Sequence, residues 1–205
     1  MFARLSFLNP YWLWAILALP ALGMIAPFFG EETRALRGVI HGSGEFAARF
    51  MIISMMATPL MMLTKGSRFA RWLVKNRRYF GVAAFAYAAV HTLAYVVFEE
   101  TLARILAEAS DFDMLTGWLA FAVFIPLAAT SMDFAVRKMG TWWKWLQRWT
   151  YGAAVLTLLH WAALHNWGGW APAAVHFAPL AALTVYRIWW TYFRKRQGQS
   201  AVAAA

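Results

Sequence analysis

Two histidines inside long apolar runs are the residues of this chain best suited to chemistry. His91 lies in "FAYAAVHTLAYVVF" (85–98), and His160 lies in "VLTLLHWAAL" (155–164). A neutral imidazole is a good metal ligand, and imidazoles from two helices can bind opposite faces of a haem iron. The chain contains no Cys, which excludes thiolate-bound zinc, iron–sulfur clusters and a covalent CxxCH haem attachment.

A second interpretation of these histidines involves no metal. An intramembrane His can hydrogen-bond a neighbouring helix for about 1 kcal/mol, or it can bind protons. The chain would then be a small transporter or a membrane assembly subunit. A transporter predicts internal symmetry or broken helices near the midplane. The sequence shows no repeat, and Pro59 and Pro126 offer only weak support for broken helices.

The composition identifies the setting of both histidines as a membrane. Of the 205 residues, 62% are hydrophobic and 13 are Trp, which is too apolar for a soluble domain of this size. Six apolar segments approach the length of a membrane span, and the first is expected to be a retained span. They cover 11–29, 44–64, 79–98, 115–132, 149–167 and 171–193. We therefore expect an all-α bundle of six transmembrane helices over 1–197, followed by a flexible tail at 198–205.

The basic residues indicate the orientation of this bundle. The net charge is +10, and most of the 19 Lys and Arg fall on the side that would hold both termini. They are Arg4, Lys65, Arg68, Arg71, Lys75, Arg77, Arg78, Arg137, Lys138, Lys144, Arg148, Arg187, Arg194, Lys195 and Arg196. Short cytoplasmic loops are rich in Lys and Arg, so both termini are expected in the cytoplasm. We therefore attribute the positive charge to membrane topology and to contact with membrane lipid, and we expect no nucleic-acid partner.

Spacing from these charges predicts the depth of the two histidines. His91 follows Arg78 by 13 residues, and His160 follows Arg148 by 12 residues. At the rise of an α-helix, both lie about 18–20 Å from the cytoplasmic boundary. They therefore share one depth in the outer half of the bilayer, where they can bind one metal centre.

The other three histidines also fall toward the outer side. His165 is five residues after His160, about 140° around the helix, so we expect it at the interface. His41 and His176 are reserve ligands. Cations for haem propionates could come from Arg34, Arg37, Arg49 and His41, and rings flanking the haem from Tyr87, Tyr95, Trp161 and Trp167.

Seven short segments, in order, resemble a known family. They are "HGSGEFA" (41–47), "TPL" (58–60), "RRYFG" (77–81), "YAAVHTLAY" (87–95), "PLAATS" (126–131), "RKMGTWWKWL" (137–146) and "LLH" (158–160). Together they resemble the ferric-reductase-like transmembrane domain, most closely the haem-binding membrane subunits of the bacterial periplasmic methionine sulfoxide reductase system. His91 and His160 match the haem histidines of that family.

The resemblance implies a b-type haem in a six-helix bundle of the bacterial inner membrane. It implies electron transfer from a cytoplasmic flavin reductase or the quinone pool to a periplasmic molybdenum-containing reductase. Some members are thought to bind FMN, so FMN or a quinone is a candidate second cofactor. The chain lacks a GxGxxG fingerprint and should not bind NAD(P)H by itself.

Two departures from the family limit what the resemblance implies. Members often carry a second His about 13 residues from each haem ligand, which creates an inner haem site. Here those positions are Arg78 and Gln147, so we expect one haem. The family also tends to have an Arg-Pro-Tyr element after the third span, where this chain reads "SDFDMLTG" (110–117). The identity of the periplasmic partner therefore stays open.

Two charged clusters are candidate docking sites for electron donors and acceptors. The cytoplasmic cluster could bind a flavin phosphate or an acidic reductase, or it could reflect topology alone. It contains Lys75, Arg77, Arg78, Lys144 and Arg148. The acidic outer loop could steer a periplasmic partner or be an ordinary solvated loop, and it contains Glu99, Glu100, Glu108, Asp111 and Asp113. The sequence thus predicts an electron-transfer membrane cytochrome.

Overall fold

The computed structural model describes residues 10–25 and 32–194, which form helices and short connections and contain no strand. This confirms the all-α class. The elements are α1 (Pro10–Ile25), α2 (Glu32–Leu63), α3 (Arg68–Glu99), α4 (Leu102–Glu108), α5 (Phe112–Ala129), α6 (Asp133–Met139), α7 (Thr141–Trp167), α8 (Trp170–Trp189) and a π-helical turn η3 (Trp190–Arg194).

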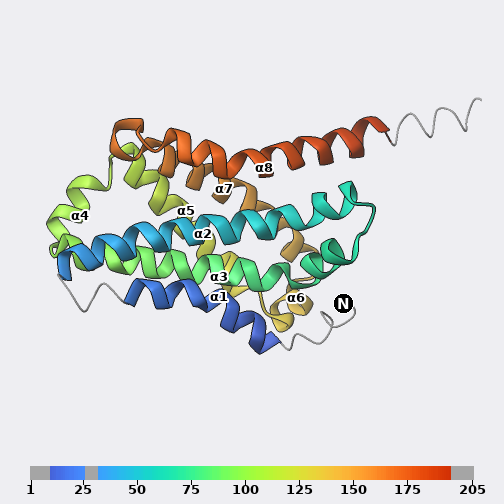
Figure 1. The fold of residues 1–205 in the computed structure, drawn as a ribbon, viewed down its shortest axis with the longest axis horizontal. Coiled ribbons are helices and arrows are strands. Elements are labelled where there is room, and N and C mark those ends of the chain that lie inside the picture. The colour runs from blue at the N-terminus through green and yellow to red at the C-terminus, as the bar shows by residue number, and fades with distance from the viewer. Residues whose placement is uncertain (1–9, 26–31, 195–205) are drawn as a thin grey trace, which may run out of the picture.

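Two helix pairs form the centre of the bundle. Helix α2 packs along α3 and helix α5 packs along α7, while α8 covers α2 and α7, and α1 covers α2 and α3. The long helices follow the long axis of the molecule, and the short helices α4 and α6 lie at opposite ends (Figure 1). The side chains of the two central pairs therefore meet in the interior of the bundle.

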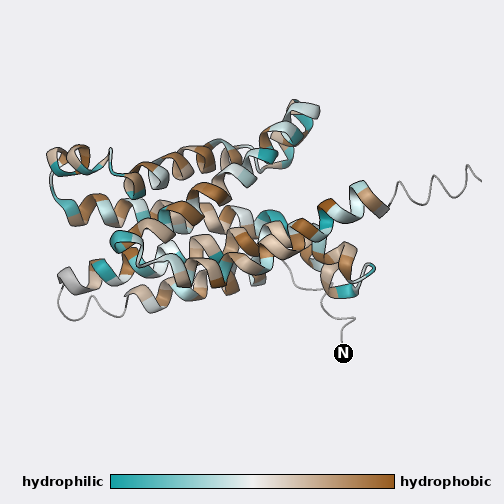
Figure 2. Cartoon of the chain, turned by 90° about the horizontal axis from the view of Figure 1, so that it is seen from above, coloured by the Kyte–Doolittle hydropathy of each residue, from teal (hydrophilic) through white to brown (hydrophobic). Residues whose placement is uncertain are grey.

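The long helices agree with the apolar segments of the sequence, although they do not all have the same apolarity. Helices α2, α3 and α5 are long and apolar enough to cross a membrane, and Tyr11–Met24 of α1 is a shorter apolar helix. Hydrophobic residues dominate the long helices, while hydrophilic residues gather mainly near their ends (Figure 2). Six spans with cytoplasmic termini remain a prediction, and the tail at 198–205 lies outside the described residues.

A tyrosine hydroxyl of α3 binds α1 at a point where one backbone hydrogen bond of α1 is interrupted. Pro20 lies inside α1 and has no N–H to donate. The N–H of Ala21 and the C=O of Leu17 would ordinarily pair with each other. Here the Tyr87 hydroxyl accepts from Ala21 N at 3.0 Å and donates to Leu17 O at 3.0 Å. Because Tyr87 is buried, its hydroxyl satisfies two backbone groups that water would not reach.

Replacing this hydroxyl should loosen α1. We expect Tyr87→Phe to lower the free energy of unfolding by about 1–3 kcal/mol, because it leaves buried backbone groups without a partner. Thermal unfolding of the purified protein in detergent measures the change. Tyr79→Phe is the matched control: its ring meets Trp14 of α1 edge-on at 5.5 Å, and its hydroxyl has no partner among the described residues. Equal losses for both variants would contradict the role of the hydroxyl.

Candidate metal centre

The structure brings His91 and His160 together in the interior of the bundle. His91 comes from α3 and His160 from α7, and both side chains are half-buried. Their ring centroids are 6.1 Å apart, and their planes are inclined at 82°. With metal–nitrogen bonds of about 2 Å, imidazoles on opposite sides of one metal ion have centroids about 6 Å apart. The separation therefore suits two ligands of a single metal.

Each imidazole is held by a backbone carbonyl of a neighbouring helix. The Nδ1 of His91 lies 2.8 Å from the carbonyl oxygen of Ile40 on α2. The Nδ1 of His160 lies 2.7 Å from the carbonyl oxygen of Asp113 on α5. A carbonyl can only accept, so each Nδ1 carries the proton and each Nε2 keeps its lone pair. This arrangement orients metal-ligating histidines and raises their basicity.

Two glycines that the sequence analysis did not single out lie against these rings. A Cβ at Gly44 would be 2.9 Å from the Nδ1 of His91, and a Cβ at Gly117 would be 2.8 Å from the Nδ1 of His160. Real Cβ atoms essentially never approach so closely. The available sequence signal was a glycine inside an apolar helix, which often marks close packing.

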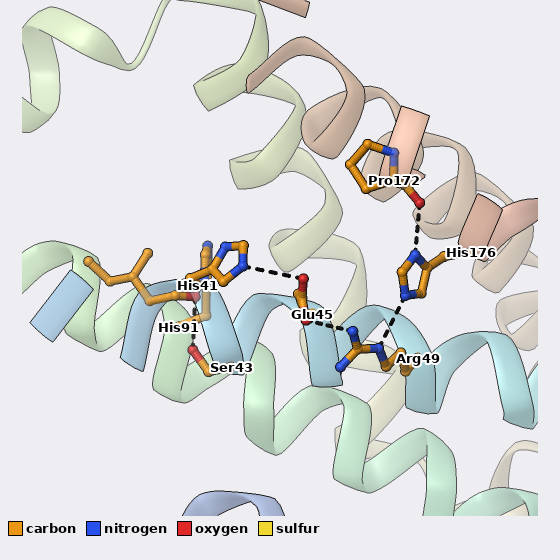
Figure 3. A network of polar contacts seen from close by, with 8 residues as sticks. His41, Ser43, Glu45, Arg49, His91, Pro172 and His176 are labelled. Atoms are coloured by element: carbon orange, nitrogen blue, oxygen red, sulfur yellow. Dashed lines mark hydrogen bonds and ion pairs between the residues drawn. The ribbon is translucent and has the colours of Figure 1, made fainter. Parts of the chain in front are cut away.

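The reserve ligands belong to a separate polar network (Figure 3). Glu45 pairs with Arg49 at 2.6 Å and with the exposed His41 at 3.3 Å. The Nε of Arg49 donates to the Nε2 of His176 at 3.3 Å, and the Nδ1 of His176 donates to the carbonyl oxygen of Pro172 at 2.8 Å. Both ring nitrogens of His176 are therefore engaged, which disfavours it as a ligand.

The remaining outer residues have partners of their own. The Tyr95 hydroxyl donates to Glu108 at 3.0 Å, and its ring meets Trp118 of α5 edge-on at 6.3 Å. His165 is exposed in a non-helical stretch near the end of α7, with φ of 57°. The other aromatic candidates pack elsewhere: Trp161 against His176, Trp167 against Phe112, and Tyr87 against Phe46 and Phe50.

A basic cavity of about 270 Å³ lies at the other end of the central helices. Five cationic residues line it: Arg77, Arg78, Lys144, Arg148 and Arg187. Four of them belong to the cytoplasmic cluster predicted from the sequence, whereas Lys75 does not line the cavity and Arg187 was missed. Arg187 was missed because it lies in the last apolar segment, far along the chain from the others.

Several of these cations already have partners. The Nη1 of Arg77 donates to the hydroxyl of Thr58 at 3.0 Å, and Arg187 donates to the hydroxyl of Tyr151 at 2.6 Å. Arg78 pairs with Asp133 at 2.6 Å. The bond from the Arg78 guanidinium holds the pKa of the Asp133 carboxyl below its usual range, so this pair persists until the pH falls through that lowered pKa.

The cavity begins about two helical turns from the imidazole pair. Met51, Ala84 and Phe124 line it, and each lies seven residues from Gly44, His91 or Gly117 on the same helix. Seven residues correspond to about 10 Å along an α-helix, and they return to nearly the same face. The imidazole pair and the basic cavity thus occupy successive levels of one helical interior.

Comparison with known proteins agrees with this class of helical membrane protein. The family described as "Ferric reductase like transmembrane component" matches residues 43–158, and the chain belongs to this family. Similar proteins include the protein-methionine-sulfoxide reductase heme-binding subunits MsrQ of Ralstonia nicotianae and Brucella ovis. The first is 30% identical over 94% of this chain and 89% of its own length. The second is 30% identical over 77% and 70%. No solved structure matches the chain significantly.

The pairing of Glu45 with Arg49 can be tested without any metal. Their side chains are 24% and 35% exposed, so solvent screens the interaction only in part. We expect a double-mutant cycle with Glu45→Gln and Arg49→Gln to give a coupling of about 0.5 kcal/mol in unfolding free energy. His41→Ala is the control, since this side chain is 77% exposed and should contribute little. A coupling of zero would contradict a structural ion pair.

Proposed function

We propose that this chain is an electron-transfer subunit of the membrane that holds one b-type haem between His91 and His160. The observation that carries the proposal is the imidazole pair, 6.1 Å apart, with each Nδ1 bonded to a carbonyl. The names of the relatives support it, because those proteins are described as heme-binding subunits. His91 and His160 would hold the iron through their Nε2 atoms, because each Nδ1 is bonded to a carbonyl.

When bound, haem supplies a one-electron iron couple, and the protein residues determine how it is held. The two carbonyl-bound imidazoles are oriented before binding, which reduces the ordering needed to ligate iron. Around this level, Phe85 of α3 and Phe121 of α5 stack at 5.9 Å with an interplanar angle of 9°. Apolar side chains of this kind exclude water and so influence the potential of a metal site.

The propionates require cations, and Arg49 and His41 are the proposed partners. They lie on α2, the helix that also supplies the carbonyl bonded to His91. Glu45 lies between them and offsets part of their positive charge. We propose that Tyr95, one helical turn after His91, contributes a wall of the site while its hydroxyl remains with Glu108.

The basic cavity is the proposed entry point for electrons. Arg78 and Gln147 line it at the two positions where an inner haem would need histidines. Neither side chain is a suitable iron ligand, which supports one haem and a different occupant below it. Five cations favour an anionic flavin such as FMN over a neutral quinone, because Arg and Lys bind phosphate well.

The direction of transfer follows from the proposed topology. With both termini cytoplasmic, the basic cavity opens toward a cytoplasmic flavin reductase, and the imidazole pair lies nearer the periplasm of a bacterial inner membrane. The names of the relatives point to a methionine sulfoxide reductase as the partner. We propose that its periplasmic, molybdenum-containing subunit is the acceptor. Of the acidic outer residues, Glu100 and Asp111 are exposed and would meet this partner, whereas Glu99 is buried and pairs with Arg104.

Haem binding is tested by substituting each proposed ligand. We expect the wild-type protein to contain one haem per chain by pyridine haemochrome assay, and His91→Ala and His160→Ala each to lose it, because each removes an axial ligand. His165→Ala is the matched control and should retain haem, since His165 is exposed at the end of the same helix as His160.

Three outcomes of this assay would contradict the proposal. Colourless protein despite a supply of haem would favour a transporter or an assembly subunit. Two haems per chain would contradict the single site, and retention in His160→Ala with loss in His176→Ala would contradict the ligand pair.

The flavin proposal is tested by titrating the detergent-solubilised protein with FMN. We expect Arg148→Ala to weaken binding about tenfold, because it removes one cation from the phosphate site. Asp133→Asn should strengthen binding, since it frees Arg78 from its carboxylate partner. Arg137→Ala is the control, because this exposed Arg at the same end does not line the cavity. Equal loss in Arg137→Ala and Arg148→Ala would indicate a diffuse charge effect and contradict a defined site.

A further inference from the structure

Two dipeptides on different helices share one hydrogen-bonding pattern. Ser43–Gly44 on α2 and Thr116–Gly117 on α5 each place a buried hydroxyl before a glycine, with the two hydroxyl residues 0% and 5% exposed. The Ser43 hydroxyl lies 2.5 Å from Val39 O and 3.3 Å from Ile40 O. The Thr116 hydroxyl lies 2.8 Å from Phe112 O and 2.9 Å from Asp113 O.

The carbonyls in this pattern are the ones that hold the proposed iron ligands. Ile40 O accepts from His91, and Asp113 O accepts from His160. In both cases the carbonyl belongs to the residue four positions before the glycine and three before the hydroxyl residue. The two imidazoles are therefore bound in the same register, although the sequence has no detectable repeat.

The position four residues after each of these carbonyls requires glycine for a steric reason. In an α-helix the carbonyl of residue i−4 points toward the N–H of residue i, so a side chain on residue i restricts access to that carbonyl. A Cβ at Gly44 would also lie 3.1 Å from the Cε1 of His91, and a Cβ at Gly117 would lie 2.9 Å from the Cε1 of His160. Any larger residue would displace the ring that approaches the carbonyl.

We propose that Gly44 and Gly117 are positioning residues for the two haem ligands, and that Ser43 and Thr116 regulate how strongly each carbonyl holds its imidazole. This inference rests on the proposed haem function and assigns it four further residues. The glycines admit the Nδ1 edge of each ring, which directs Nε2 toward the metal. Each hydroxyl shares its one hydrogen between two carbonyls and so competes in part with the imidazole N–H. The competition is stronger at Asp113 O, 2.9 Å from the Thr116 hydroxyl, than at Ile40 O, 3.3 Å from the Ser43 hydroxyl.

The glycine assignment predicts a defect beyond folding. We expect Gly44→Ala and Gly117→Ala to weaken haem binding about 10–100-fold, the usual effect of disturbing a partner of a metal ligand. In the haem that is retained, the low-spin ferric signal in electron paramagnetic resonance should shift, because the ring orientation changes. Measuring both quantities separates displaced ligands from a general loss of protein.

The chain offers matched glycine controls in its own helices. Gly38 lies in α2, where an added Cβ meets nothing within 4 Å among the described residues outside its own helix backbone, and Gly152 lies in α7, where the nearest such atom is at 3.7 Å. Gly38→Ala and Gly152→Ala should leave haem affinity and the ferric signal unchanged. Wild-type values for Gly44→Ala and Gly117→Ala would overturn the proposal, and equal defects in the controls would do the same.

The haem-free protein provides an independent test of the glycines. With ¹⁵N-labelled histidine, nuclear magnetic resonance should show His91 and His160 as the Nδ1–H tautomer in the wild type, because both donate to carbonyls. Gly44→Ala should alter only the His91 signals, and Gly117→Ala only those of His160. If the wild type binds no haem but gives this result, the haem function fails while the positioning geometry stands; unchanged signals in both variants overturn the positioning.

The hydroxyl assignment predicts a change in potential at constant haem content. Removing a competing donor in Ser43→Ala or Thr116→Val strengthens the Nδ1–H bond to the carbonyl and raises the basicity of the imidazole. A more basic ligand stabilises ferric iron, so the midpoint potential should fall in a redox titration. Thr116→Ser keeps the hydroxyl and should retain the wild-type potential. A potential that stays constant or rises in Ser43→Ala and Thr116→Val would overturn this part of the proposal.

Discussion

The site depends on two hydrogen bonds from imidazole N–H groups to helix carbonyls. His91 and His160 stand in an apolar interior, where a polar ring without a partner is costly. Ile40 and Asp113 accept these bonds through their backbone, so each histidine is satisfied while its second nitrogen stays available. The same bonds connect α3 to α2 and α7 to α5, so the orientation of the two imidazoles is part of the helix packing.

Much of the arrangement could be predicted from the sequence because membrane helices have strict constraints of length and charge. The six predicted apolar segments overlap long helices of the described chain, three of which are long and apolar enough to cross a membrane. Counting residues from Arg78 and Arg148 predicted that the two histidines would meet, and their ring centroids lie 6.1 Å apart. The close approach of Gly44 and Gly117, the cavity position of Arg187 and the network around His176 could not be predicted. Each depends on which faces of separate helices meet, and periodicity within one helix does not contain that information.

The charge around the imidazole pair differs from the charge in the basic cavity. Around the histidines, ionisable groups are paired: Glu45 with Arg49, and Glu108 with Tyr95. Five cations and no acid line the cavity among the described residues, and the nearby Asp133 pairs with Arg78. An anion would therefore be attracted to the basic cavity. The region around the imidazole pair is better suited to a neutral group or to one whose charges compensate each other.

The use of main-chain carbonyls as partners has a consequence for how this protein can change over generations. A carbonyl is present whatever side chain occupies its position, so substitutions at Ile40 and Asp113 can accumulate without removing the acceptor. Sensitivity to mutation moves instead to Gly44 and Gly117, where every replacement is larger. The outer surface of the bundle can thus change while two small residues preserve the approach of each imidazole to its carbonyl.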